Sequence, residues 1–172
     1  TCALPICRIL NLAQLIQSHA LSFFHLSSPD LLLGWDSDPA QRNFFGVAAK
    51  FPEFARDGIR LRQLGQSIIE LLGGKRLHAA WTVAGGVSEP LSTEHRDRML
   101  TMIGEALEIA CRTLKAFKPT LEKHRQEIRS FGNFPSYFLG LVDPHGGLEH
   151  YDGCFRVKRS EEHTSELQSH SF

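Results

Sequence analysis

The sequence predicts a mainly α-helical fold, a helical bundle followed by a small C-terminal antiparallel β-hairpin. Residues 8–26 are apolar on nearly every side, and apolar residues recur at intervals of three and four along residues 92–131. Near the C-terminal end, residues 138–142 and 148–157 are predicted strands joined by the turn sequence DPHGG. Helical periodicity indicates the first two elements, and short runs around a glycine-rich turn indicate the third.

The helix predicted over residues 8–26 carries a single polar stripe on an otherwise apolar surface. Such a helix belongs inside a larger protein, with the stripe facing a partner helix or a polar cavity. We expect the helix to end at SSPD, because Pro29 has no N–H to continue the hydrogen-bond ladder. The stripe residues recur every three or four positions: Asn11, Gln14, Ser18, Ser22 and His25.

Two further helices are predicted before a loop. The first covers residues 39–49, with Asp38 as its N-cap and a proline at its first position. The second covers residues 52–72 and ends at the pair Gly73-Gly74, which is typical of a helix C-terminus. Residues 75–91 form a short apolar patch bounded by glycine and proline, so we expect a structured loop there.

The helix over residues 92–131 is the longest expected element. Pro119 should kink it without ending it, because the periodicity continues beyond that residue. We expect Leu114 and Phe117 near the centre of its buried face. That face comprises Met99, Ile103, Ala106, Ala110, Leu114, Phe117, Leu121, His124, Ile128 and Phe131.

Charge and composition exclude several classes of protein. The 172 residues include 19 basic and 19 acidic side chains, so the formal net charge is zero and gives no field for nucleic acid or anionic membranes. No apolar run approaches the roughly 18 residues that a membrane span needs. The cysteines, at positions 2, 7, 111 and 154, are too few and too scattered for a disulfide framework. We therefore expect a cytoplasmic protein.

The two ends differ from the middle of the chain. Residues 159–172 are almost entirely polar and resemble the in-frame translation of a common sequencing adapter, and residues 1–7 resemble the same adapter read from the opposite strand. Such segments are set aside before the fold is considered. The expectation is that residues 8–158 are an internal piece of a longer reading frame.

Histidines are the first candidates for chemistry. His19 and His25 are six residues apart, which does not place them on one helical face as a metal-binding pair would be. Core histidines, or histidines that support a site without binding its metal, fit this spacing better. Without further information, these patterns indicate only a mostly helical protein segment.

Three blocks carry a resemblance to a known family. They are QSHALSFFHLSSPDLLLGWDSDPAQRN at residues 17–43, GGKRLHAAWTVAGG at residues 73–86 and NFPSYFLGLVDPHGGLEHYDGCFRV at residues 133–157. In this order and at these separations they closely resemble the large, catalytic subunit of nickel–iron hydrogenases, especially the cytoplasmic NAD-linked bidirectional branch. The resemblance implies the helical fold of that subunit.

The resemblance also implies an activity that this chain cannot perform alone. The family cleaves H2 reversibly at a nickel–iron centre held by cysteine thiolates of two CxxC motifs, and this chain has no CxxC. The implied partners are an iron–sulfur small subunit, with its iron–sulfur clusters, and diaphorase subunits that pass electrons to NAD. The residues expected to support the site, or to transfer protons or electrons, are Ser18, His19, Ser22, His25 and His78.

Two alternatives stay open at this point. One is a metal-free homologous subunit of a quinone-reducing respiratory complex, and the other is a helical interaction scaffold with no redox role. The complete gene would distinguish them from a hydrogenase, because neither alternative requires the paired cysteines.

Overall fold

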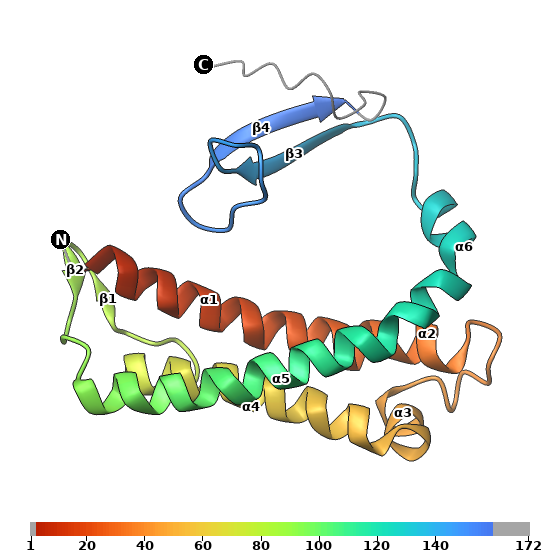
Figure 1. Ribbon diagram of the computed structural model, residues 1–172, viewed down its shortest axis with the longest axis horizontal. Helices are drawn as coiled ribbons and strands as arrows, with labels where there is room; N and C mark the ends of the chain where they lie inside the picture. The colour runs from red at the N-terminus through yellow and green to blue at the C-terminus, as the bar shows by residue number, and fades with distance from the viewer. Residues whose placement is uncertain (1–2, 160–172) are drawn as a thin grey trace. The chain divides into compact units, whose positions relative to one another are not determined.

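The computed structural model describes residues 3–159, and these fall into two compact units (Figure 1). The first unit ends at Lys123 and the second begins at His124. Within the described residues, no helix is both long enough and apolar enough to span a membrane. The fold is mainly helical with a small antiparallel hairpin, as the sequence predicts.

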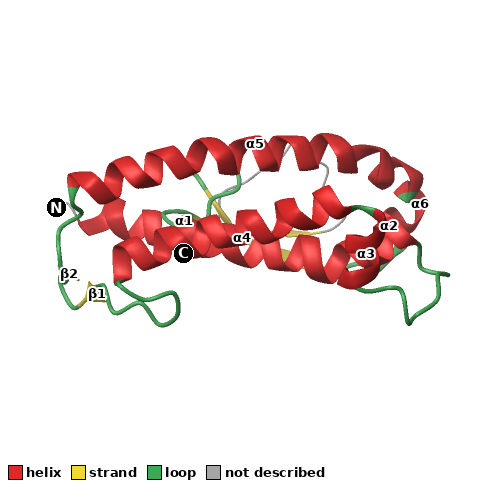
Figure 2. Cartoon of the chain, turned by 90° about the horizontal axis from the view of Figure 1, so that it is seen from below, coloured by secondary structure: helices red, strands yellow, loops and turns green. Residues whose placement is uncertain are grey.

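Three long helices run alongside one another in the first unit, and Figure 2 shows them from below. Helix α1 packs along α4, and α5 packs on α4. The elements of the unit are α1 (Ala3–Leu21), the π-helix η1 (Ser22–Ser27), α2 (Ser28–Leu33), α3 (Phe44–Lys50), α4 (Pro52–Gly73), β1 (Thr82–Val83), β2 (Gly86–Val87) and α5 (Thr93–Lys123).

The first helix does not end at SSPD, and this corrects the sequence prediction. Helix α1 passes into the π-helix η1 and then into α2, which has Pro29 in its first turn. In the π-turn the Ser28 N–H donates to the carbonyl of Phe23, five residues back. The buried Ser28 hydroxyl donates to the Phe24 carbonyl at 2.6 Å. Pro29 cannot supply an N–H to that carbonyl, so the serine side chain satisfies it instead.

The third helix begins five residues later than predicted. Asp38 caps a turn, with its Oδ1 accepting from the Ala40 N–H at 2.9 Å. Asn43 is the true N-cap of α3, since its Oδ1 accepts from the N–H groups of Phe45 and Gly46 at 2.9 and 3.1 Å. Both residue types favour this role, so the sequence alone did not choose between them.

Helix α4 agrees with its prediction, and the loop after it is structured, as expected, with two short strands that were not predicted. The helix ends at Gly73, and its C-cap Gly74 adopts the left-handed conformation with φ +67°. Residues 75–91 include the two-residue strands β1 and β2, paired antiparallel. Trp81 is buried beside them and donates from its Nε1 to the Glu89 carbonyl at 2.9 Å. The surrounding core comprises Ala13, Ile68, Ile69, Leu72, Trp81 and Met99.

The long C-terminal helix is divided, and its buried face is shifted from the predicted one. Helix α5 continues through Pro119, as predicted, but ends at Lys123, and α6 (Arg125–Ser130) follows after non-helical backbone at His124. Phe117 is buried as expected, whereas Leu114 is 54% exposed. Its expected place at the centre of the core was therefore wrong. The buried residues of α5 are Met99, Ile109, Thr113 and Phe117.

The second unit contains α6 and the predicted hairpin, which is confirmed. Strand β3 (Tyr137–Val142) pairs antiparallel with β4 (Cys154–Arg159), and Tyr137 lies opposite Arg159. Asp143 organises the turn, because its Oδ1 accepts from the N–H groups of His145 and Gly147, both at 2.8 Å. The second strand was predicted over residues 148–157 and is shorter and later in the structure, with only an isolated bridge at Leu148.

The segments expected to be adapter-derived fall partly outside the described residues. Residues 1–2 and 160–172 lie outside them. Helix α1 begins at Ala3, and Ile6 packs against the core. The artificial origin of residues 1–7 and 159–172 stays a prediction, which resequencing of the gene with a different library chemistry would test.

Candidate functional site

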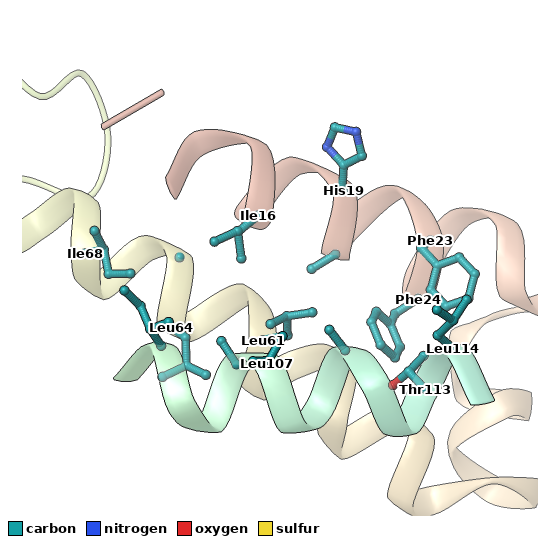
Figure 3. Close-up of a pocket in the computed structure, with 15 residues that line it drawn as sticks. Ile16, His19, Phe23, Phe24, Leu61, Leu64, Ile68, Leu107, Thr113 and Leu114 are labelled. Carbon is teal, nitrogen blue, oxygen red and sulfur yellow. The ribbon is translucent and has the colours of Figure 1, made fainter. Parts of the chain in front are cut away.

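An apolar groove of about 480 Å³ lies between α1, α4 and α5 (Figure 3). Exposed fractions of 63% for Leu107 and 54% for Leu114 show that α5 leaves apolar surface uncovered there. The only buried polar atom on the wall without a partner in the described residues is the Thr113 hydroxyl. The groove offers no group for acid–base chemistry in its interior. Its lining includes Ile16, Phe23, Leu61, Leu64, Leu107 and Leu114.

Two bidentate ion pairs join α5 to α4. Arg60 donates from Nε and an Nη to Glu105 at 2.6 and 2.7 Å, and Arg112 donates likewise to Asp57 at 3.0 and 2.8 Å. The hydrogen bonds from Arg60 lower the pKa of Glu105. These pairs set the position of α5 along α4, and therefore the width of the groove.

His19 lies at the edge of the groove and does not fill it. The ring is exposed, its Nδ1 lies 2.8 Å from the Leu15 carbonyl, and it points away from the apolar side chains (Figure 3). Among the other predicted site residues on the first helix, Ser18 and Ser22 are exposed. The predicted polar stripe therefore lies mostly on the exposed side of the helix in this chain, since Gln14, Ser18 and Ser22 are exposed.

His25 is the predicted site residue with the most specific surroundings. It lies in η1, and π-helical turns occur often at functional sites. Its ring stacks on Phe44 of α3, with centroids 4.3 Å apart and planes 15° apart. Its Nδ1 is buried and has no hydrogen-bond partner in the described part of the chain.

Arg62 of α4 completes this polar cluster, and sequence reasoning missed it. Its Nε is also buried without a partner among the described residues. Its positive charge acts on His25, whose pKa is lowered first by burial and second by Arg62, against a smaller opposing effect of the Ala20 backbone. An arginine among the mixed residues of an amphipathic helix carries no sequence signal of this role.

His78 is separate from the cluster. It lies in the loop after α4, whereas His25 packs on α3, so the structure does not bring the two together. His78 is exposed and has φ +52°, the one positive φ of a non-glycine residue in the described ranges. Strained backbone of this kind occurs at functional sites.

The described residues do not fit a nickel–iron centre. Within residues 3–159, no three His, Cys, Asp or Glu side chains come together as a metal site would require. The described cysteines, Cys7, Cys111 and Cys154, are free and lie in α1, α5 and β4. A centre of this kind needs several positioned thiolates. No chemical step through such a centre can be assigned to this chain.

The shifted pKa of His25 predicts a pH-dependent stability. The unfolded histidine takes up a proton near pH 6.5, whereas the folded one resists protonation. Stability should therefore fall as the pH drops through this value towards the lowered pKa. We expect the urea midpoint to decrease between about pH 7.5 and pH 5.5, and to decrease less in His25→Gln. His19→Gln is the control and should keep the wild-type slope; identical slopes in all three proteins would contradict the prediction.

Comparison with known proteins identifies relatives of this chain. No protein-family model matches it. The chain is 37% identical over 148 residues to a subunit of the F420-non-reducing hydrogenase vhu of Methanocaldococcus jannaschii, and 32% identical over 162 residues to the beta subunit of the NAD-reducing hydrogenase HoxS of Cupriavidus necator. The chain is related to hydrogenase subunits. These alignments cover 86% and 91% of the chain but only 35% and 33% of the hydrogenase relatives.

A segment of a solved hydrogenase has the same fold as this chain. A crystal structure of an NAD+-reducing [NiFe]-hydrogenase in the H2-reduced state matches with a TM-score of 0.84 and 41% identity. The match covers 91% of this chain and 35% of that one. The chain thus spans about a third of the length of the hydrogenase subunits that it matches.

These comparisons correct the narrower identification made from the sequence, the large, catalytic subunit of nickel–iron hydrogenases. Neither the names of the two relatives nor the description of the solved structure designates a large or catalytic subunit. The relatives are hydrogenase subunits of NAD-linked or F420-non-reducing type, and the identification extends to that level. The fold is likewise that of a segment of a hydrogenase subunit.

Proposed function

We propose that this chain is part of a cytoplasmic, NAD-linked hydrogenase subunit. The observation that carries the proposal is the TM-score of 0.84 at 41% identity to an NAD+-reducing [NiFe]-hydrogenase over 91% of the chain. The complete assembly would cleave H2 reversibly into protons and electrons. The electrons would pass to an iron–sulfur partner subunit and, through diaphorase subunits, to NAD.

Within that assembly, this chain supplies framework and polar support. The nickel–iron centre takes its ligands from outside residues 3–159, because these residues bring no ligand set together. Ser18, His19, Ser22, His25 and His78 are the candidates for orienting groups near the centre, or for moving protons or electrons. Of these, His25 has the best support, since it is held by stacking on Phe44.

The experiment is the recovery and expression of the complete reading frame. Matured together with its partner subunits, the complete protein should reduce NAD+ in the presence of H2. The 172-residue chain, expressed with the same maturation machinery, should bind neither nickel nor iron stoichiometrically and should not reduce a redox dye under H2. Metal analysis and dye reduction measure both properties.

Three results would count against the proposal. One is a nickel-loaded, active 172-residue chain. Another is a complete assembly that reduces quinone but does not react with H2, which would indicate the metal-free respiratory homologue. The third is a complete gene with no neighbouring iron–sulfur partner genes, which would indicate a helical scaffold.

A further inference from the structure

Two hydrogen-bonding atoms, one on η1 and one on α4, are buried without a partner among residues 3–159, and the two elements pack against each other. The Nδ1 of His25, from η1, and the Nε of Arg62, from α4, are both buried and lack partners within the described residues. An arginine carries its charge at every physiological pH, and its Nε can only donate. A buried N–H donor without an acceptor is unfavourable. The pair therefore points to a missing acceptor.

The carboxylates of α2 and α4 are already engaged. Elements α1, α2, α3 and α4 pack against η1, and Phe117 of α5 meets it through the ring of Phe23. Among their described residues, α1, α3 and η1 contain no Asp or Glu. Each carboxylate of α2 and α4 has an arginine partner other than Arg62. These pairs are Asp30–Arg42 at 3.3 Å, Glu53–Arg56 at 3.9 Å, Asp57–Arg112 at 2.8 Å and Glu70–Arg76 at 2.9 Å.

The geometry also holds the His25 donor in place. Stacking on Phe44 fixes the plane of the His25 ring, and the π-turn fixes its position on the helix. The fully buried Ser28 hydroxyl donates to the Phe24 carbonyl and so constrains the neighbouring backbone. A donor that is already held in position loses little conformational entropy when it binds an acceptor.

We propose that His25 and Arg62 form a binding site for one carboxylate group. The Arg62 Nε–H donates to one carboxylate oxygen, and the His25 ring, with its proton on Nδ1, donates to the other. A carboxylate supplies two acceptor oxygens and the negative charge that Arg62 lacks, which a water molecule or a carbonyl does not. The carboxylate is either a side chain from the remainder of the longer subunit or a free small carboxylate. The existence of the site does not depend on the proposed hydrogenase activity.

Formate is the probe for the 172-residue chain. We expect the ring NMR signals of His25 to move to saturation as sodium formate replaces sodium chloride at constant ionic strength, while those of the exposed His19 do not. The affinity should fall roughly tenfold or more in Arg62→Gln, because a charge-assisted hydrogen bond is lost. Arg62→Lys keeps the charge but not the Nε–H, and should bind with intermediate affinity.

Arg56→Gln, which removes a surface arginine of the same helix, is the matched control and should bind formate like the wild type. Circular dichroism establishes that each variant is folded. No movement of the His25 signals with formate, or equal movement in folded Arg62→Gln, would overturn the proposal.

The complete subunit distinguishes the two sources. If its own side chain fills the site, the His25 signals of the complete protein should not respond to formate, and they should already resemble those of the formate-saturated 172-residue chain. If the ligand is a free carboxylate, the complete protein should respond as the shorter chain does. Signals in the complete protein that neither respond to formate nor resemble the saturated chain would overturn the site.

Discussion

Phe24→Ala is expected to lower the free energy of unfolding by roughly 3–5 kcal/mol. Phe24 is 2% exposed, and its ring lies against those of Phe23 and Phe54, with centroid distances of 5.1 and 4.7 Å. It sits in η1 and fills the space between this π-helix and α4. Truncation leaves a cavity that the α-helices on either side cannot close without moving. Urea unfolding followed by circular dichroism measures the change.

The matched control for this prediction is Phe45→Ala in α3. The Phe45 side chain is 82% exposed, so its removal should change stability by no more than about 0.5 kcal/mol. Equal effects of the two substitutions would show that Phe24 is not part of the core. A change in the slope of the urea curve would instead indicate that unfolding is not two-state.

Gly58→Ala is expected to destabilise the protein by about 1–3 kcal/mol, although alanine favours helices over glycine. A Cβ at Gly58 would meet the Cβ and Cγ of Phe24 at 2.5 Å. The close approach of α4 to η1 therefore requires a residue without a side chain. Gly104→Ala in α5 is the control: its Cβ meets nothing within 4 Å, so this change should stabilise by about 0.5–1 kcal/mol.

A double-mutant cycle ties the two predictions to one contact. With Phe24 already replaced by alanine, the obstruction at Gly58 is largely removed. Gly58→Ala should then lose most of its destabilising effect, giving a coupling energy of about 1 kcal/mol or more. Additive effects of the two substitutions would contradict a direct contact between these residues.

Much of the fold could be predicted because its signals are local. The periodic apolar residues of α4 and α5 and the glycine pair after α4 are contained within single helices. The hairpin of β3 and β4 is signalled by DPHGG, where Asp143 and the glycines form the turn themselves. Such features depend on neighbours a few residues away, so sequence reasoning identifies them.

The candidate site was only half predictable. The polar stripe indicated His25, because its spacing differs from the apolar background of the helix. Arg62 and Phe44, which give His25 its surroundings, lie 37 and 19 residues further along the chain. Only the packing of α3 and α4 against η1 brings these three residues together, and no spacing within one helix records that packing.

The sequence by itself determined the helical character of the chain, the turn chemistry of its hairpin and the lack of a CxxC ligand set, since these depend on residue type and local spacing. The tertiary structure decided whether Pro29 ends a helix and which face of α5 is buried. Ser28 supplies the hydrogen bond that Pro29 cannot, and the outcome depends on a buried hydroxyl reaching one carbonyl. Leu114 is exposed because α5 rests on α4 along a different face, which the ion pairs of Arg60 and Arg112 hold in place. Such choices rest on contacts between distant residues, and those contacts exist only in the folded chain.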